Sequence, residues 1–404
     1  MQSTIAYISP GPTYNAHSPL YQRVFKKLSG NFRGYILTTG SATETFPIGN
    51  FTYSSIRAKY SAADSLRFFS FCWESASRIR DKGERIKLVT TYDPLKTGLI
   101  GLAVSRMHRA RFAPEVNGVY TSPAEWIDNA GSIGTKVKKT LYPQIMRFVL
   151  KHADGIKLLY KEQISPFGEV IRGKIVRDFH CLVPVENFRN IREDKEVLFV
   201  GFPFKRKGVD ILIEAFKKIA PGYPEWKLKI LGWFPDPGEM YRAIGGHPQI
   251  YHHKPVKHEK IIGHIGSCAI LVLPSRSEAM GRVLVESMAA GKPRIGSNVD
   301  GIPTVINDGV DGLLVRPEDT DDLAEKLDML MGDPALRYRL GRAGEVRAER
   351  EFSEKVFLDN ITSFYQEVLG AGPGKNMQAP GKPGSPPKKN IQEDKDDHRE
   401  MQAS

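Results

Sequence analysis

Hydrophobic positions in the first half of the chain fall into short runs separated by longer segments with helical spacing. The runs that have the length of buried strands are Ser3–Pro10, GYILTTG and IKLVTTYDP. The segments that place apolar residues on one side of a helix are SPLYQRVFKKL, SLRFFSFCWESASRIR and KTGLIGLAVSRMHRA. Strands that alternate with helices predict an α/β half with a largely parallel sheet.

A second series of the same kind begins near Glu196–Pro203 (EVLFVGFP) and predicts a second α/β half. Its further strands are WKLKILG, IYHHKPV, CAILVLPS, PRIGS and DGLLV, with helical segments between them. We therefore expect domains at 1–190 and 191–352, then a helix at 353–369 that crosses back onto the first domain. Residues 370–404 are rich in Gly, Pro and charge, so we predict a disordered tail.

Composition places this 404-residue chain, 41% hydrophobic and 26% charged, among soluble globular proteins. No run reaches eighteen apolar residues, so no transmembrane helix is expected. The first fifteen residues lack the basic start and apolar stretch of a signal peptide. Cys72, Cys181 and Cys268 lie far apart, which indicates reduced thiols. These features together predict a cytoplasmic protein.

The formal net charge of +12 is concentrated in one half of the chain. Residues 1–190 hold 27 Lys and Arg against 14 Asp and Glu, whereas residues 191–404 hold 31 against 32. The asymmetry suggests that the first half faces an anionic partner, namely a membrane surface, a phosphorylated substrate or a nucleic acid. The alternative is a basic surface that serves solubility only. No nucleic-acid-binding module is recognisable, so no nucleic-acid partner is expected.

Residues Lys136–His152 combine apolar positions at helical spacing with lysines and arginines. One interpretation is a basic amphipathic helix that lies on an anionic membrane, which would make the protein peripheral to the bilayer. The other is a helix that packs its apolar stripe on the sheet and is kinked at Pro143. The sequence favours the second interpretation without excluding contact between exposed lysines and lipid.

Two glutamates lie eight positions apart in LPSRSEAMGRVLVESMAAGKP. Glu278 follows a buried strand, at the edge where parallel sheets bind ligands. Gly281 lets the backbone approach a ligand, and the helix that begins near Arg282 points its N–H groups at the same place. Glu286 lies one turn into that helix, and a carboxylate accepts hydroxyl hydrogen bonds well. The segment suits a nucleotide diphosphate sugar.

A second segment, VGFPFKRKGVDILIEAF, ends another strand with cations. Arg206 and Lys207 stand just before Gly208 and a helix, where they could neutralise a diphosphate leaving group. The alternative is a solvated cluster of cations on a turn. The glutamate segment favours the first interpretation.

The second half resembles the nucleotide-sugar-dependent retaining glycosyltransferases of family 4. The matching pieces are VGFPFKRKGVD, LKILG, LVLPS, SEAMGRVLVESMAAGKP, GSNVDGIPTVINDGVDGLLV and PEDTDDLAEKL, in family order over about 170 residues. The resemblance implies an α/β GT-B fold, in which two Rossmann-like domains face each other across a cleft. It further implies that the first domain binds the acceptor and the second binds the nucleotide sugar.

The resemblance also implies roles for individual residues. Glu278 would bind the donor sugar near the reacting carbon, Glu286 would hold the ribose, and Arg206 and Lys207 would stabilise the diphosphate. Backbone N–H groups for the sugar and phosphate would come from Met280, Gly281 and Arg282. The base would lie beside Gly232 and Val256. No metal or other cofactor is implied, and transfer would retain the configuration at the sugar.

The chain departs from the family pattern at three places. Phe202 stands where an arginine often follows the first strand of the second half. Gly11 alone stands where a Gly-Gly loop usually touches the phosphates. Asn117 stands where a histidine often lies near the acceptor, and an amide does not titrate.

Two weaker motifs have structural interpretations. Asp319, in the sequence PEDTDDLAEKL, is expected to cap a helix rather than bind a metal. His252, His253 and His258 lack the further ligands of a metal site.

The sequence as a whole predicts a transferase that acts in envelope or exopolysaccharide assembly on an anionic or lipid-linked acceptor. The alternatives are a nucleotide-sugar hydrolase, epimerase or glycosyl phosphorylase, or a non-catalytic membrane-associated partner.

Overall fold

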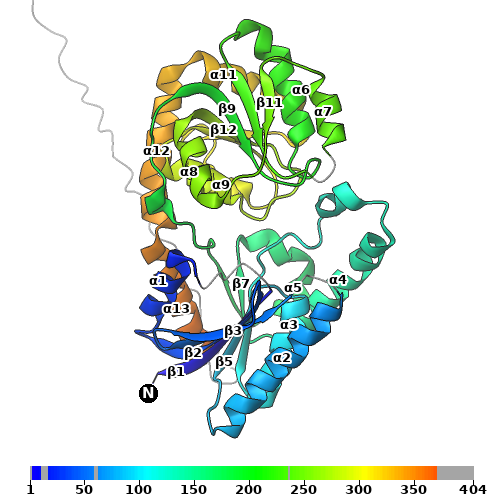
Figure 1. The fold of residues 1–404 in the computed structure, drawn as a ribbon, viewed down its shortest axis with the longest axis vertical. Coiled ribbons are helices and arrows are strands. Elements are labelled where there is room, and N and C mark those ends of the chain that lie inside the picture. Colours follow the sequence, from blue (N-terminus) through cyan, green and yellow to red (C-terminus); the bar gives the residue numbers. More distant parts are fainter. Residues whose placement is uncertain (1, 11–16, 59–61, 235–236, 371–404) are drawn as a thin grey trace, which may run out of the picture. The chain divides into compact units, whose positions relative to one another are not determined.

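The computed structural model describes residues 2–10, 17–58, 62–234 and 237–370 (Figure 1). The predicted tail and Gly11 lie outside the described residues. All three cysteines are described, and none forms a disulfide.

The first half is built on a six-stranded sheet in the order β3-β4-β2-β1-β5-β6. Only the β3–β4 pair is antiparallel. The strands are β1 (Ser3–Ser9), β2 (Phe32–Gly40), β3 (Glu44–Ile48), β4 (Phe51–Arg57), β5 (Leu88–Thr91) and β6 (Arg111–Pro114). The alternation of strands and helices predicted the parallel pairs, because each requires a crossover. It did not predict the β3–β4 hairpin.

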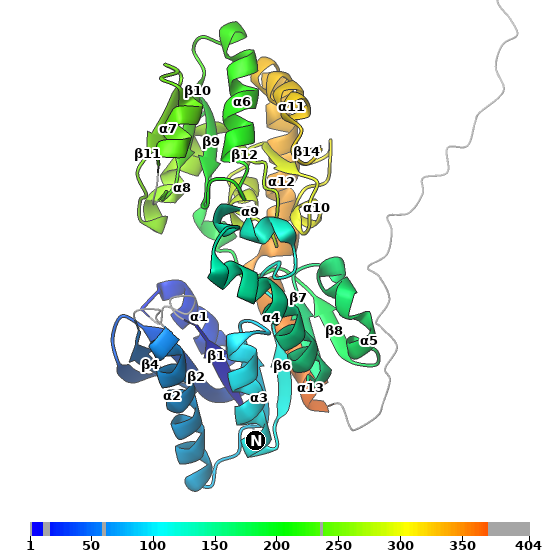
Figure 2. The ribbon, with the colours of Figure 1, turned by 90° about the vertical axis from the view of Figure 1, so that its right-hand side faces the viewer.

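Helices cover both faces of this sheet (Figures 1 and 2). Side chains of α1 (Pro19–Leu28) and α13 (Glu354–Gly370) share one apolar core with the sheet. Those of α2 (Ala62–Asp81), α3 (Lys96–His108) and α4 (Ile133–Lys151) share the other. The connecting 3-10 helix η2 (Pro123–Asn129) precedes α4.

A two-stranded parallel sheet extends the first half beyond β6, because Glu115 bridges to Lys157 in β7. Its elements are β7 (Gly155–Leu158), η3 (Lys161–Phe167), α5 (Gly168–Ile171) and β8 (Ile175–Asp178), and η4 (Val185–Asn187) follows.

The second half is a fully parallel sheet in the order β11-β10-β9-β12-β13-β14. Its strands are β9 (Asp194–Val200), β10 (Lys227–Leu231), β11 (Ile250–His253), β12 (Cys268–Leu273), β13 (Arg294–Ser297) and β14 (Leu313–Val315). The order reverses between β9 and β12, so the crevice at their carboxyl ends is where such a sheet binds ligands.

The helices of the second half pack in two groups. Helix α6 packs against α7 and α11, and α9 packs against α8 and α12. They are α6 (Val209–Ile219), η5 (Ala220–Gly222), α7 (Gly238–Ile244), α8 (His258–Ser267), α9 (Arg282–Ala289), α10 (Ile302–Val305), α11 (Thr320–Gly332) and α12 (Pro334–Phe352). The sequence pattern did not predict α12, which is rich in arginine and lacks a clear apolar stripe.

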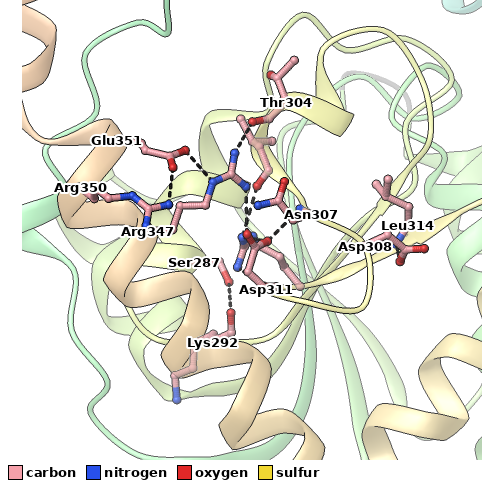
Figure 3. A network of polar contacts seen from close by, with 12 residues as sticks. Ser287, Lys292, Thr304, Asn307, Asp308, Asp311, Leu314, Arg347, Arg350 and Glu351 are labelled. Atoms are coloured by element: carbon pink, nitrogen blue, oxygen red, sulfur yellow. Dashed lines mark hydrogen bonds and ion pairs between the residues drawn. The ribbon is translucent and has the colours of Figure 1, made fainter. Parts of the chain in front are cut away.

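A buried ionic network fastens α12 to the second sheet (Figure 3). Asp311 Oδ1 accepts from Arg294 Nη2 at 2.7 Å, and its Oδ2 accepts from Arg347 Nη1 at 3.0 Å. Arg347 also donates to the Thr304 carbonyl at 2.6 Å and to Glu351 at 2.7 Å. Burial lowers the pKa of Arg294 to about 10, with Asp311 opposing that shift. The guanidinium therefore depends on Asp311 for its charge partner.

The predicted packing of the Lys136–His152 stripe on the sheet is wrong for three of its members. Met146, Val149 and Leu150 are the side chains that α4 buries in its second half. Val137, Leu141 and Phe148 are about half exposed instead. The helix continues through Pro143. One side of α4 therefore lacks apolar cover in the described structure.

Candidate functional site

Two segments meet at the carboxyl ends of the neighbouring strands β9 and β12. A Cβ atom on Gly208 would lie 1.9 Å from the Pro274 carbonyl oxygen, and Gly208 has a φ of +69°. Only glycine allows this approach and this conformation together. The Arg276 amide also donates to the Arg206 carbonyl at 2.8 Å. The two segments that the sequence singled out are thus held side by side.

Lys207 and Glu278 form an ion pair between these segments. The Lys207 Nζ atom donates a hydrogen bond to Glu278 Oε2, and the two side chains are only 14% and 12% exposed. Burial by itself raises the pKa of Glu278, but the charge and hydrogen bond of Lys207 and the charge of Arg206 outweigh it, so that the pKa is lowered. Glu278 is therefore an ionised carboxylate inside the site.

Asp300 fixes the backbone around Glu278. Its Oδ2 atom accepts from Ser277 Oγ at 2.7 Å and from the Glu278 amide at 3.0 Å. The Glu278 carbonyl accepts from the Gly301 amide at 3.1 Å. Asp300 itself adopts a left-handed φ of +45°, which is uncommon for a residue with a side chain. This arrangement holds Glu278 in place before any ligand binds.

The N terminus of α9 opens beside Glu278. Gly281 precedes the helix with a φ of +73°, Met280 is buried, and Arg282 is exposed at the first helical position. No side chain caps this helix. Its first N–H groups and the helix dipole therefore favour an anion here.

Glu286 is buried on the first turns of α9. Burial raises its pKa, and the charges of Arg282 and His258 oppose the shift. His258 Nε2 lies 3.9 Å from Glu286 Oε1. No side-chain hydrogen bond to the Glu286 carboxylate comes from the described residues, so the carboxylate has acceptor capacity that ligand hydroxyls could fill.

Arg206 takes a different partner from Lys207. Its Nη1 atom lies 3.0 Å from Glu125 Oε2 in η2. Asp128 of the same 3-10 helix accepts from the amides of Lys205 and Arg206, at 2.8 and 2.9 Å. The structure therefore brings Lys207 to Glu278 and turns Arg206 toward the first half.

Aromatic side chains surround the ends of β9, β10 and β11. Gly232 lies against Gly201, because a Cβ atom on Gly232 would meet the Gly201 carbonyl at 2.2 Å. Phe202 and Trp233 follow these glycines, with ring centroids 5.1 Å apart, and are 41% and 59% exposed. Val256 is half-buried and packs against the core of the second half. Phe202, which replaces the expected arginine, thus belongs to an exposed aromatic pair.

Asn117 lies in a network at the end of β6 and β7. Its Nδ2 atom donates to Glu115 at 3.1 Å, and its Oδ1 atom accepts from Lys157 Nζ at 2.9 Å. Lys157 is wholly buried and pairs with Glu115 at 3.3 Å. Asn117 lines a pocket together with Tyr21, Tyr92, Glu115, Lys157 and Arg282. The pocket joins polar groups of the first half to the N terminus of α9.

Asp319 caps a helix as predicted, and His252, His253 and His258 each make a separate contact. Asp319 caps α11 by accepting from the amides of Asp321 and Asp322. His252 contacts the Gly232 carbonyl, His253 packs on His264, and His258 approaches Glu286. The described residues contain no group of three or more His, Cys, Asp or Glu placed to hold a metal.

Sequence reasoning missed several residues of this region. Asp300, Trp233, Glu115 and Lys157 were not singled out, and His258 was considered only as a metal ligand. Two of them left a signal: Lys157 interrupts the apolar run GIKLLY, and Trp233 follows the end of a strand. Asp300 and His258 left none, because their importance depends on contacts distant in the chain.

The family model described as Glycosyl transferases group 1 matches residues 186–347. An uncharacterized glycosyltransferase, MJ1178 of Methanocaldococcus jannaschii, is 33% identical over 42% of this chain and 48% of its own length. The capsular polysaccharide biosynthesis glycosyltransferase CapM of Staphylococcus aureus is 30% identical over 47% of this chain and 51% of its own length. The chain thus spans about half the length of these curated relatives.

Solved structures resemble the whole described chain in fold. Sucrose-phosphate synthase from Thermosynechococcus elongatus has a TM-score of 0.75 at 17% identity and covers 92% of this chain and 100% of its own. Anabaena Alr3699/HepE in complex with UDP has a TM-score of 0.65 at 14% identity and covers 91% and 99%. The predicted α/β GT-B fold is confirmed.

Proposed function

Because the C-terminal half of this chain belongs to the group 1 glycosyltransferases, we propose that the protein moves a sugar from a nucleotide diphosphate donor to an acceptor, with retention. The observation that carries the proposal is the largely buried Lys207–Glu278 pair beside the uncapped N terminus of α9. It joins a cation, an ionised carboxylate and an anion site at one edge of a parallel sheet.

The departing diphosphate is the group that this site serves best. The anomeric carbon exchanges its bond to the diphosphate oxygen for a bond to an acceptor hydroxyl oxygen. The electron pair of the broken bond stays with the diphosphate, which can also take the hydroxyl proton, so negative charge grows on the phosphate as the bond breaks. Lys207 and the N–H groups at the start of α9 are fixed in advance where that charge develops, which lowers the barrier. Arg206 adds its charge from further away, since Glu125 holds its guanidinium. We assign no metal to the reaction.

Glu278 and Glu286 divide the polar groups of the donor between them. Glu278, ionised and held by Asp300, accepts from hydroxyls of the sugar near the reacting carbon. Glu286, one turn into α9, accepts from the ribose hydroxyls. The exposed faces of Trp233 and Phe202, beside Gly232, offer a stacking surface for the base. Anabaena HepE, which shares the fold, was crystallised with UDP, in keeping with such a donor.

The acceptor enters from the first half in this proposal. The pocket of Tyr21, Tyr92, Asn117 and Arg282 presents hydroxyl, amide and cationic groups toward the start of α9. Arg282 and the positive charge of residues 1–190 favour an anionic or lipid-linked acceptor. The relative CapM is named for capsular polysaccharide biosynthesis, which agrees with a role in envelope or exopolysaccharide assembly.

The first experiment measures the melting temperature of the full chain with UDP, GDP, ADP, dTDP and CMP, then with sugars of the nucleotide that binds. A ligand at 100 times its Kd should stabilise the protein by about 2.7 kcal/mol. Products are then analysed with and without a glycan acceptor. Transfer that requires acceptor supports the proposal. Sugar release or isomerisation that ignores acceptor identifies a hydrolase or epimerase instead, and no response to any nucleotide at millimolar concentration refutes a nucleotide donor.

A further inference from the structure

Exposed large hydrophobic side chains of the first half are gathered on one side. In the described part of residues 2–190, every such side chain lies on α2, α3, η2 or α4, and each is between 39% and 80% exposed. They are Leu66, Phe69, Trp73, Leu99, Ile127, Ile133, Val137, Leu141 and Phe148. Scattered apolar residues need no explanation, but a concentration of this kind marks an interaction site.

The helices α2, α3 and α4 lie side by side, and their outer surfaces face the same way (Figures 1 and 2). Helix α3 packs against both α2 and α4. On α2, buried Phe68, Cys72 and Ala76 point to the core. Leu66, Phe69 and Trp73 recur three and four positions apart, on a different side of that helix. Phe69 and Trp73 stack with ring centroids 6.2 Å apart, so they form an aromatic pair on the outer side of α2.

Helix α4 continues the apolar surface with a stripe of its own. Ile133, Val137 and Leu141 lie four positions apart, which places them in one row along the helix. Met146 and Val149, which face the core, belong to the opposite side of the helical wheel. We call the outer surface formed by α2, α3 and α4 the α2–α4 face.

Basic side chains frame the α2–α4 face. Lys136 and Lys138 flank Val137, and Lys96 lies one turn before Leu99. The exposed cations of α3 and α4 are Lys96, Arg106, Lys136, Lys138, Lys139, Arg147 and Lys151. Neither helix contains an Asp or Glu residue. The face therefore combines exposed apolar side chains with an excess of cations, and its aromatic pair, Phe69 and Trp73, lies on α2.

We propose that the α2–α4 face docks on a lipid bilayer that carries anionic headgroups. The lysine and arginine stems cover apolar surface while their charges reach the headgroups, and each such charge strengthens attachment. Trp73 and Phe69 suit the boundary between headgroups and acyl chains. No helix in the described ranges is both long and apolar enough to span a bilayer, so the protein would lie on the surface.

A second copy of this chain is a poorer occupant of the face. A two-fold interface would set the same patch against itself. The cations of α3 and α4 would then meet cations of the other copy, because neither helix carries a carboxylate. The carboxylates of α2 already pair with arginines of the same helix, in the pairs Asp64–Arg67, Glu74–Arg78 and Asp81–Arg80. Charge complementarity thus selects an anionic surface. The inference is independent of the proposed transfer reaction, because it rests on no residue of the donor site.

The test is sedimentation of the full chain with vesicles of neutral phosphatidylcholine and with vesicles that contain phosphatidylglycerol. An apolar variant carries Trp73→Ser, Val137→Ser and Leu141→Ser, and a charge variant carries Lys136→Gln, Lys138→Gln and Lys139→Gln. Matched controls change exposed residues outside the α2–α4 face, namely Val310→Ser with Tyr338→Ser and Val346→Ser, and Lys195→Gln with Lys227→Gln and Lys355→Gln. All five proteins are compared by circular dichroism and light scattering.

We expect the wild type and both controls to bind the anionic vesicles and not the neutral ones. The charge variant should bind about fivefold more weakly for each lysine removed, hence roughly 100-fold in total. The apolar variant should lose binding while its fold stays intact. The proposal is overturned if the wild type ignores anionic vesicles, or if the controls lose binding as much as the variants. A dimer of the wild type that the apolar variant breaks would overturn it too, because the face would then be an interface between copies.

Discussion

Lys207 donates from its Nζ atom to the Glu278 carboxylate, joining a residue before α6 to one 71 positions later after β12. If this lysine stabilises the departing diphosphate, Lys207→Met should lower kcat by roughly 100- to 1,000-fold. The same change should raise the pKa of Glu278, because burial is then less opposed. The acid limb of the pH–rate profile should therefore move to higher pH. Lys218→Met, at a half-exposed lysine on α6, is the control. A kcat within twofold of the wild type would contradict the assignment.

Glu286 should contribute to the affinity for the nucleotide through hydrogen bonds from the ribose hydroxyls. Glu286→Gln should raise the Kd of the preferred nucleoside diphosphate by roughly 10- to 150-fold, the range for losing hydrogen bonds to a charged acceptor. The wild type should also prefer the ribonucleotide over its 2′,3′-dideoxy analogue, and the variant should not. Calorimetry of the four combinations checks this, with the exposed Glu349→Gln as control. Equal discrimination in both proteins would place the ribose elsewhere.

Trp233 should contribute through the base alone. Trp233→Ala removes an exposed stacking surface, so the Kd for the nucleoside diphosphate should rise by roughly 5- to 150-fold. The affinity for inorganic pyrophosphate should stay unchanged, because it has no base. Titration of both ligands, with Tyr338→Ala as the control, separates the two effects. If the affinity for pyrophosphate falls equally, Trp233 shapes the loop instead of stacking on the base.

Asp311 should be a main determinant of stability in the second half. Asp311→Ala leaves the buried guanidinium of Arg294 unpaired, so the free energy of unfolding should fall by about 3–5 kcal/mol. The matched change Asp308→Ala removes one exposed bond to the Leu314 amide and should cost only about 1 kcal/mol. Replacing the pair together, as Arg294→Met with Asp311→Leu, should restore most of the loss. Urea unfolding measures all three.

His180 should make stability depend on pH. Burial, with Arg347 and Lys157 nearby, lowers its pKa from 6.5 to about 4. The unfolded chain therefore binds a proton that the folded chain does not between these values. The stabilisation is complete above pH 6.5 and is lost as the pH falls toward 4, at up to about 1.4 kcal/mol per pH unit. In His180→Gln, which can keep the contact with Thr304 Oγ1, unfolding measured from pH 7 to 5 should show a smaller slope. Parallel slopes would contradict the role of His180.

The sequence by itself determined the parts that depend on local pattern. Buried runs alternating with amphipathic segments determined the α/β class, because a parallel strand needs a crossover. Glu278, Gly281, Glu286 and Lys207 could be picked out because each stands at the end of a predicted strand or the start of a predicted helix. The cap at Asp319 followed from the same local rules.

Only the tertiary structure decided which of these residues meet. Gly208 lets the chain pass against Pro274, and this contact brings Lys207 to Glu278 and leaves Arg206 to Glu125. The pairings of Asp300, His258 and Lys157 join positions that local periodicity does not relate. The sequence left the outward stripe of α4 undecided for the same reason, because its pattern allowed either packing on the sheet or contact with a membrane. A helical pattern shows that a side of a helix is apolar, but only the packed sheet decides which side is covered.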